Sequence, residues 1–206
     1  MLALQLIMLA VIQQGAPMIQ LPEHRSTNVS IEECIASRRS VRTFRSQNLT
    51  QEDIATLLWA GQGITSERGF RAAPSAGATY PLVLYYATGQ GLFQYNPKSH
   101  GATKKSDSDL RKSIARSALN QMFIADAGMV IVITARFSNT TARYGERGIR
   151  YVYIEVGHCA QNIHLEAVAL GLASVPVGAF DDAALKDVLG LEHEEPLYII
   201  PVGYPR

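Results

Sequence analysis

The sequence predicts an α+β fold in which a mixed or antiparallel sheet packs between helices. Helices with clear start signals, short apolar runs rich in β-branched residues, and one long apolar-periodic segment at residues 148–172 indicate this class. The chain has 206 residues, of which 47% are hydrophobic and 18% charged. It is therefore long enough to bury a substantial core within one domain.

Two helices are expected before residue 65. Ser30 and Glu33 form a capping-box sequence that opens a helix ending near Arg39. Thr50 is placed to cap a second helix, whose apolar residues recur at helical spacing and whose end is marked by Gly63.

The later elements follow from alternating or helical spacing and from turn residues. They are a hairpin of strands 82–87 and 92–95 around a turn at 89–91, a helix starting at Ser108 or Asp109, a buried strand 127–137, the long core helix 148–172, a helix capped by Asp181 and a final strand 196–202.

Composition argues against several classes of function. A formal net charge of +1 gives no field for nucleic acid, and the sequence holds no zinc-ligand spacing or helix-turn-helix signal. Cys34 and Cys159 fall inside expected helices and indicate reduced packing residues. His158 and His164 are six residues apart, the wrong spacing for two metal ligands on one helix face, so no metal site is expected and both are interpreted as core or interface histidines.

Residues 1–16 form an apolar N-terminal segment, separate from a main domain at residues 17–206. The segment resembles the apolar region of a signal peptide, but no Lys or Arg precedes it and Gly15-Ala16 is a poor cleavage site. It is too short for a stable membrane span, which needs roughly 20 apolar residues. Two interpretations stay open. The segment is either a helix that packs on the main domain or on a second subunit of a cytoplasmic protein, or a signal for export.

Residues 37–44 form a basic stretch with three arginines and three hydroxyl side chains. In an extended segment, Arg38, Ser40 and Arg42 share one face. Arginine suits bidentate contact with phosphate and the electron-rich edge of a redox cofactor. The stretch is therefore interpreted as an anion seat, the alternative being a solvated helix C-terminus.

A long loop follows the second expected helix. Its residues 73–81 are mostly small, which lets a backbone approach a ligand closely, although an ordinary connection has the same composition. The segment without periodicity spans residues 66–81, and structureless loops longer than about 12–15 residues tend to be functional or disordered. The length of this loop therefore slightly favours a functional role.

Taken in order, these motifs resemble the FMN-dependent nitroreductase superfamily over residues 21–206. The resemblance is carried by the basic stretch, the Pro-Ser-x-Gly-Ala loop at 74–78, Gln161-Asn162 in the long helix, and the segments 176–179 and 201–205. Residues 58–65, 73–81 and 144–151 resemble its SagB-type branch, some members of which oxidise azolines to azoles in peptide biosynthesis. The resemblance implies an intertwined homodimer with FMN at the subunit interface.

The same resemblance implies roles for single residues. Arg38 and Ser40, with Arg39 close by, would bind the phosphate and ribityl tail, and Arg42 would reach the N1/O2 edge of the flavin ring. The loop of the second subunit would contact the flavin. The remaining cofactor-binding residues implied are Pro74, Ser75, Ala76, Gly77 and Ala78 of that loop, Asn120 or Gln121 as an amide donor, and Pro176, Val177, Gly178 and Ala179, with the Gly178 N–H at flavin N5.

The expected activity is ping-pong hydride transfer from NAD(P)H, through FMN, to a nitroaromatic or quinone-type small molecule. Arg143-Tyr144 stands where azoline-oxidising relatives have Lys-Tyr, and both residues are substrate-side candidates without an assigned catalytic role. Arginine is a poor general base, which weakens the azoline interpretation. Two alternatives stay open: a SagB-type dehydrogenase acting on an azoline-like heterocycle, and a non-catalytic flavin-binding subunit.

One carboxylate in the long helix requires a partner. Glu155 lies among apolar residues, where an unpaired charge is costly. The sequence analysis predicts an ion pair with Arg147 or Arg150.

Overall fold

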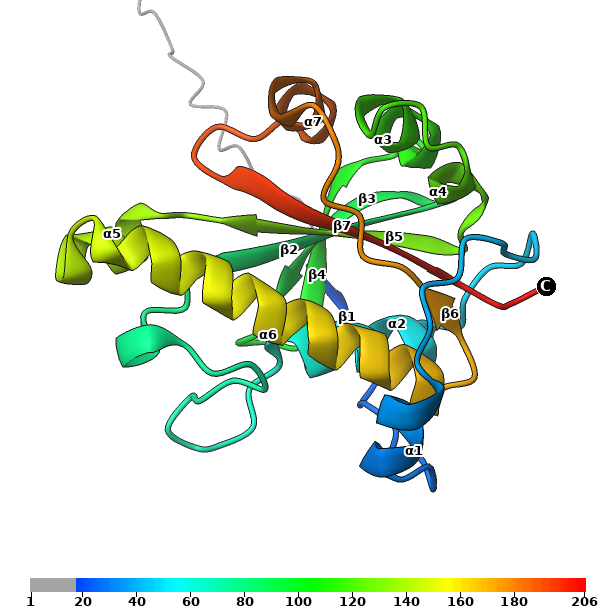
Figure 1. Ribbon diagram of the computed structural model, residues 1–206, viewed down its shortest axis with the longest axis horizontal. Helices are drawn as coiled ribbons and strands as arrows, with labels where there is room; N and C mark the ends of the chain where they lie inside the picture. Colours follow the sequence, from blue (N-terminus) through cyan, green and yellow to red (C-terminus); the bar gives the residue numbers. More distant parts are fainter. Residues whose placement is uncertain (1–17) are drawn as a thin grey trace, which may run out of the picture.

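The computed structural model describes residues 18–206, so the interpretation of residues 1–16 falls outside the part described. Its centre is a seven-stranded sheet in the order β1-β4-β3-β2-β5-β7-β6, with antiparallel pairing between all neighbours. Helices cover both faces (Figure 1). The α+β class with an antiparallel sheet between helices is thereby confirmed.

The hairpin and the two buried central strands lie where the sequence predicts them. Three strands were not expected: β1 and β6 are very short, and β4 carries polar residues with no apolar run. The strands are β1 (Met18–Gln20), β2 (Leu82–Thr88), β3 (Gly91–Asn96), β4 (Gly101–Ser106), β5 (Met129–Ala135), β6 (Ala173–Ser174) and β7 (Glu195–Gly203).

The helices agree with the sequence at their caps more than at their ends. The helix expected from Ser108 or Asp109 begins later, because Asp109 binds the Arg111 side chain and backbone instead of capping a helix. The helices are α1 (Ile31–Ser37), α2 (Gln51–Gln62), the 3-10 turn η1 (Ala76–Ala78), α3 (Arg111–Ser117), α4 (Phe123–Asp126), α5 (Ser138–Tyr144), α6 (Arg147–Ala169) and α7 (Asp182–Leu189).

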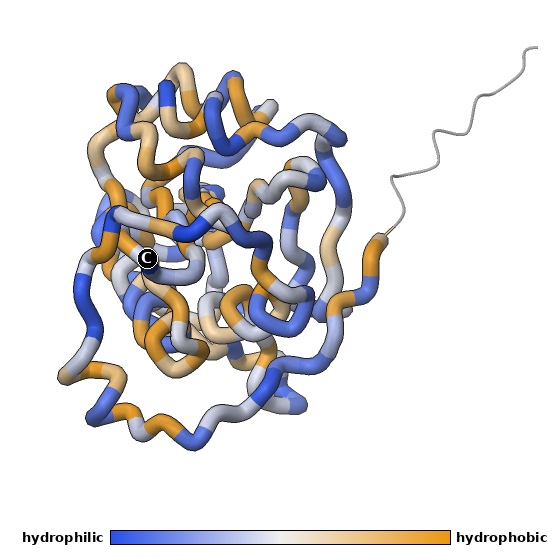
Figure 2. The backbone as a smooth tube through the Cα atoms, turned by 90° about the vertical axis from the view of Figure 1, so that its right-hand side faces the viewer, coloured by the Kyte–Doolittle hydropathy of each residue, from blue (hydrophilic) through white to orange (hydrophobic). Residues whose placement is uncertain are grey.

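Two hydrophobic clusters hold the layers together. Residues of α2 and α6 pack on one face of the sheet, and residues of α3, α4 and α7 pack on the other. Hydrophobic and hydrophilic residues alternate along the helices, as expected for elements with one buried side (Figure 2). No helix within residues 18–206 is long and apolar enough to cross a membrane.

Helix α6 has a buried and an exposed side. Val152, Cys159 and Ile163 are buried against the core, whereas Tyr153 and Ile154 on the other side stay exposed. The long core helix predicted at 148–172 is thereby confirmed, with bounds that differ by one residue at the start and three at the end.

We expect Thr50→Ala to destabilise the protein by about 1 kcal/mol, the usual cost of a lost helix N-cap. The Thr50 hydroxyl accepts from the Asp53 N–H at 3.1 Å, and the Asp53 carboxylate accepts from the Thr50 N–H at 3.4 Å. Urea unfolding measures the change, with Ser26→Ala at an exposed loop position as the control. Equal unfolding midpoints for the two variants would contradict the prediction.

Candidate functional site

The basic stretch is an extended segment that pairs with β6. Ser40 forms a parallel bridge with Ser174, and the Val41 N–H donates to the Ser174 carbonyl at 3.1 Å. Four residues on, Phe44 bridges to Pro205 and its ring is buried in the core. The backbone of residues 40–44 is therefore held at both ends. Successive side chains of this extended segment point to opposite sides of the backbone.

Arg38 enters this segment from the end of α1. Its Nη1 lies 3.1 Å from Nε2 of His164, and Nδ1 of that ring is hydrogen-bonded to the Ser174 hydroxyl. Burial, and next to it the Arg38 charge, lower the pKa of His164 to about 4. The ring is therefore neutral at ordinary pH, as expected for a satisfied core histidine.

The other two arginines of the basic stretch have different surroundings. Arg39 donates from Nη1 to the carbonyls of Ala36 at 3.0 Å and of Arg38 at 2.7 Å, so its side chain turns back onto the end of α1. Arg42 is exposed, with its guanidinium carbon 5.9 Å from the centre of the Phe123 ring. Within residues 18–206, none of the three forms an ion pair with a carboxylate.

The turn at residues 176–179 lies beside the connection between α3 and α4. Gln121 joins the two, because its Nε2 donates at 3.0 Å to the carbonyls of Ala118 and Ala179. A Cβ built at Gly178 would meet only the Tyr198 ring, at an ordinary 3.6 Å, and Gly178 itself is exposed. No close contact within the described chain thus requires glycine here, which fits a backbone left open for a ligand.

The structure therefore brings one group of the predicted site residues together. Ser40, which lies between Arg38 and Arg42, pairs with Ser174 of β6. The chain continues from β6 into the 176–179 turn, and Gln121 lies against that turn. Asn120 is exposed with a positive φ of 59°, and no side-chain hydrogen bond holds it in the described structure. The Nε2 group of Gln121, in contrast, already donates its two hydrogens to the carbonyls of Ala118 and Ala179.

The loop at 73–81 forms a second group elsewhere. Its 3-10 turn lies against α5: the Arg143 Nη1 donates to the Gly77 carbonyl at 3.2 Å, and the Thr79 and Thr140 hydroxyls are 2.8 Å apart. The Tyr144 hydroxyl also lies against Gly77. Both substrate-side candidates thus contact the loop that the sequence analysis predicts to touch the flavin.

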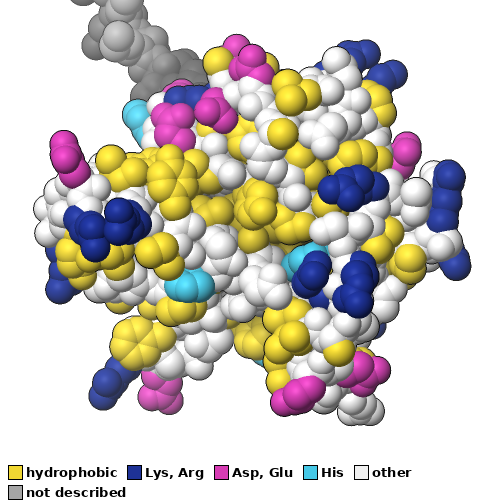
Figure 3. Space-filling model, viewed as in Figure 1, with side chains coloured by type: hydrophobic (Ala, Val, Ile, Leu, Met, Phe, Trp, Pro, Cys, Tyr) yellow, Lys and Arg dark blue, Asp and Glu magenta, His cyan; other side chains and the backbone are white. Residues whose placement is uncertain are grey.

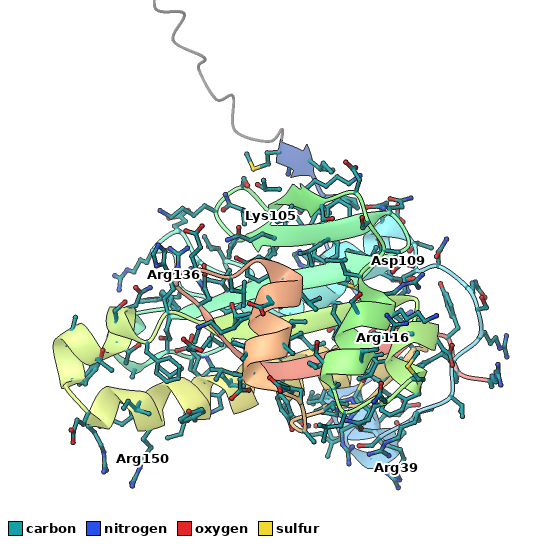
Figure 4. All side chains as sticks on the ribbon, turned by 90° about the horizontal axis from the view of Figure 1, so that it is seen from above. Arg39, Lys105, Asp109, Arg116, Arg136 and Arg150 are labelled. Atoms are coloured by element: carbon teal, nitrogen blue, oxygen red, sulfur yellow. The ribbon has the colours of Figure 1, made fainter. Side chains whose placement is uncertain are left out.

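The two groups reach α6 at different points along the helix. The loop reaches this helix at Glu155, and the basic stretch reaches it at His164, nine residues further on. Nine residues span about 13.5 Å along an α-helix. Figure 1 shows the loop below one half of α6 and the basic stretch rising from α1 beside the other half. In Figure 4, Arg150 on α6 and Arg39 after α1 both project outward.

The predicted ion pair of Glu155 with Arg147 or Arg150 is wrong. At about 100° per residue, Arg150 lies on the far side of α6 from Glu155, and Arg147 is two turns away. Both arginines are exposed, whereas Glu155 is only 2% exposed. Its neighbours are the Ser75 hydroxyl and the Arg71 guanidinium, and its Oε1 has no hydrogen-bond partner within the described chain.

Burial raises the pKa of Glu155 to about 7, against a lowering by the Ser75 hydrogen bond and by the Arg71 charge. Arg71 is itself held by Gln62, whose Oε1 accepts from its Nη1 at 2.6 Å. The carboxyl group is thus a buried anchor of the loop. Sequence reasoning missed this link and the Arg38–His164 contact, because both join residues that are far apart along the chain.

We expect Glu155→Gln to remove a pH dependence of stability. Between pH 4.5 and 7 the folded protein keeps a proton that the unfolded chain has lost, so the free energy of unfolding falls as pH rises, by roughly 3 kcal/mol at most. The variant lacks this slope and gains stability relative to wild type at pH 8. Urea titrations from pH 4.5 to 8 test this, with exposed Glu146→Gln as the control; equal slopes for wild type and Glu155→Gln would refute it.

The sequence is similar to known proteins over most of its length. The nitroreductase family matches residues 35–204. A nitroreductase-family protein of Methanocaldococcus jannaschii is 43% identical over 191 residues, which cover 90% of this chain and 95% of that protein. The trifolitoxin-processing protein TfxB of Rhizobium leguminosarum bv. trifolii is 28% identical over 139 residues, which cover 62% of this chain and 37% of TfxB.

Solved structures agree with this match. A nitroreductase-type protein from Ralstonia eutropha JMP134 has a TM-score of 0.83 and 26% identity, covering 92% of this chain and 90% of that one. The NADPH:FMN oxidoreductase of Vibrio harveyi, complexed with NAD+, has a TM-score of 0.64 and 23% identity, covering 85% and 68%, a likeness of fold. The family match spans most of the chain, and the first relative is similar over almost its whole length. This chain therefore belongs to the nitroreductase family.

Proposed function

We propose that this chain is an FMN-dependent oxidoreductase that transfers hydride from NAD(P)H to a nitroaromatic or quinone-type acceptor by a ping-pong mechanism. Membership of the nitroreductase family supports redox chemistry. FMN would supply that chemistry by accepting a hydride and passing it on. The chain's own residues would bind the cofactor, orient it and set its charge environment.

The observation that best supports this proposal is the set of hydrogen-bond donors in the basic stretch beside β6. Arg38 and Arg42 have no carboxylate partner within residues 18–206, and the bridge to Ser174 fixes Ser40 between them. This donor set fits the chemistry of FMN: fixed cations suit a phosphate and the N1/O2 edge of a flavin ring, which becomes anionic on reduction. In the proposed site, Gly178 offers its N–H to N5 without a side chain in the way.

A second subunit completes the proposed site. In the proposed dimer, the loop at 73–81 of one subunit faces the cofactor that the basic stretch of the other subunit holds. The exposed side of α6 carries Ile149, Tyr153 and Ile154 beside Arg147 and Arg150, and these residues form an open, nearly flat surface. Figure 3 shows hydrophobic side chains gathered on this face. Such an apolar patch is typical of an interface.

Arg143 and Tyr144 would then face the substrate through the loop that they support. Arginine does not accept a proton at working pH, so removal of a proton from an azoline finds no base at position 143. Reduction of an acceptor does not need one there. The contact of Arg143 with the Gly77 carbonyl gives this side chain a supporting role in the loop.

A second candidate function is oxidation of an azoline-like heterocycle, as in the SagB-type branch. The similarity to the trifolitoxin-processing protein TfxB favours it, over a part of each chain. A non-catalytic flavin-binding subunit is the third alternative. Purified protein that shows a flavin spectrum and bleaches anaerobically with NADH or NADPH supports the main proposal, whereas wild-type flavin that neither nicotinamide reduces refutes it.

We expect Arg38→Ala to weaken FMN binding by about 1.5–3 kcal/mol, or roughly 10- to 150-fold in Kd, the range for a lost hydrogen bond to a charged group. Fluorescence titration of flavin-free protein measures the change. Lys105→Ala is the matched control, because it removes an exposed cation on β4, outside the proposed site. Stoichiometric flavin retained by Arg38→Ala through gel filtration would defeat the assignment.

Arg42→Gln should lower the flavin reduction potential and slow reduction by nicotinamide. A fixed charge near N1/O2 stabilises the anionic reduced flavin by roughly 1–4 kcal/mol, which is about 20–90 mV for a two-electron couple. Dye-linked titration gives the potential, and Arg116→Gln on the exposed side of α3 is the control. An unchanged potential in Arg42→Gln, with turnover abolished by Arg143→Ala, would overturn this assignment.

Ile154→Asp should convert a dimer into a monomer that loses FMN, because it buries a charge in the proposed interface. Ile154 is exposed in the single chain, so the variant should still fold. Light scattering and the flavin content of the eluted protein measure both effects, with exposed Lys105→Glu on β4 as the control. A monomer that still holds FMN tightly would rule out the composite site.

A further inference from the structure

We propose that His164 is a positioning residue for the cofactor phosphate, which acts by holding the Arg38 guanidinium in one orientation. This inference rests on the proposed FMN function and deepens it. His164 lies on α6, 126 residues from Arg38 in the sequence, and is 2% exposed. It is therefore placed behind the anion seat, out of reach of solvent.

The contacts form a chain through three elements. Arg38, which follows α1, approaches His164 with its Nη1 3.1 Å from Nε2. The opposite ring nitrogen, Nδ1, is hydrogen-bonded to the hydroxyl of Ser174 in β6. Both polar atoms of the imidazole are thus used, and the ring cannot rotate without breaking one of these contacts.

The chemistry of the two partners determines the tautomer. A guanidinium group has donors and no acceptor, so Nε2 of His164 has to accept, and the ring proton lies on Nδ1. That proton is then donated to the Ser174 hydroxyl oxygen. The pKa of His164, lowered to about 4 mainly by burial and also by the Arg38 charge, agrees with a ring that stays neutral.

Ser174 joins this side-chain contact to the backbone of the anion seat. Its carbonyl accepts from the Val41 N–H at 3.1 Å, and its backbone pairs with Ser40. One residue of β6 therefore sets the position of Ser40 directly and that of Arg38 through His164. The relative placement of these two phosphate-binding residues depends on this arrangement.

The arrangement has a consequence for ligand selectivity. A free arginine side chain loses much rotamer freedom when it binds an anion, and prior fixation lowers that cost. Only a flavin that carries a phosphate benefits. A histidine that merely filled the core would instead affect FMN and riboflavin to the same degree.

The test compares His164→Asn with His164→Gln. An asparagine amide corresponds in reach to Nδ1 and keeps a contact with Ser174, whereas a glutamine amide corresponds to Nε2 and can still accept from Arg38. The dissociation constants of FMN and riboflavin are measured on flavin-free protein by fluorescence quenching. We expect His164→Asn to weaken FMN binding about 5- to 20-fold with riboflavin within twofold of wild type, and His164→Gln to stay within threefold for both flavins.

A double-mutant cycle and a spectroscopic readout separate positioning from general damage. In the Arg38→Ala background, His164→Asn should have no further effect on FMN affinity, because the group that it positions is gone. The ¹⁵N spectrum of flavin-free wild type should show the Nδ1-protonated tautomer, a result that depends neither on flavin binding nor on a variant that folds.

Three outcomes overturn the inference. An Nε2-protonated ring contradicts the direction of the Arg38 contact. Equal loss of FMN and riboflavin in His164→Asn, or additive effects in the cycle, assigns His164 a structural role alone while the FMN function stands. Wild-type protein that binds neither flavin refutes the proposed function, and this inference with it.

Discussion

The buried side of α6 is the constraint on which the rest of the structure depends. Val152, Cys159 and Ile163 pack against the core, so the helix has to lie along one face of the sheet. Two polar residues on this buried side, Glu155 and His164, contact the loop and the anion seat, which also pair with α5 and β6. Packing of α6 thereby fixes where both segments meet the core.

Burial shifts the titration of both attachment points toward their neutral forms. Burial lowers the pKa of His164 to about 4 and raises that of Glu155 to about 7, so desolvation disfavours the charged form in both cases. The permanent charges of half-buried Arg38 and exposed Arg42 lie toward the surface, where an anion can reach them. Because the buried groups favour their neutral forms, the core avoids an uncompensated charge, and the two arginines stay available for a ligand.

The sequence was informative where local physics decides the structure. Capping residues such as Thr50 and Asp181, and the β-branched run of β5, depend on neighbours within a few positions, and these elements were predicted correctly. Strand β4 has no apolar run, because it lies near the sheet edge between β3 and the short β1. Such a strand depends on its partners, which no local pattern records.

The same limit applies to the site. The anion seat was predicted from the alternation of Arg38, Ser40 and Arg42, a local pattern whose extended backbone the structure bears out. The predicted partner of Glu155 is wrong, because residues that are close in sequence can lie on different sides of a helix, and the helical turn places Arg150 on the other side. The support of Arg38 by His164 could not be predicted, since it spans 126 residues and arises only when the end of α1 packs against α6.

The separation of the two groups along α6 links assembly to cofactor binding. If the loop of one subunit closes the anion seat of another, FMN binds the dimer more tightly than the monomer, and by linkage FMN stabilises the dimer to the same extent. The buried anchors matter for this coupling, because a loop held by Glu155 and Arg143 needs less ordering when the second subunit arrives. In the proposed dimer, a fold that attaches both segments to one core helix would keep their positions fixed relative to each other, so that two copies can bring loop and anion seat together.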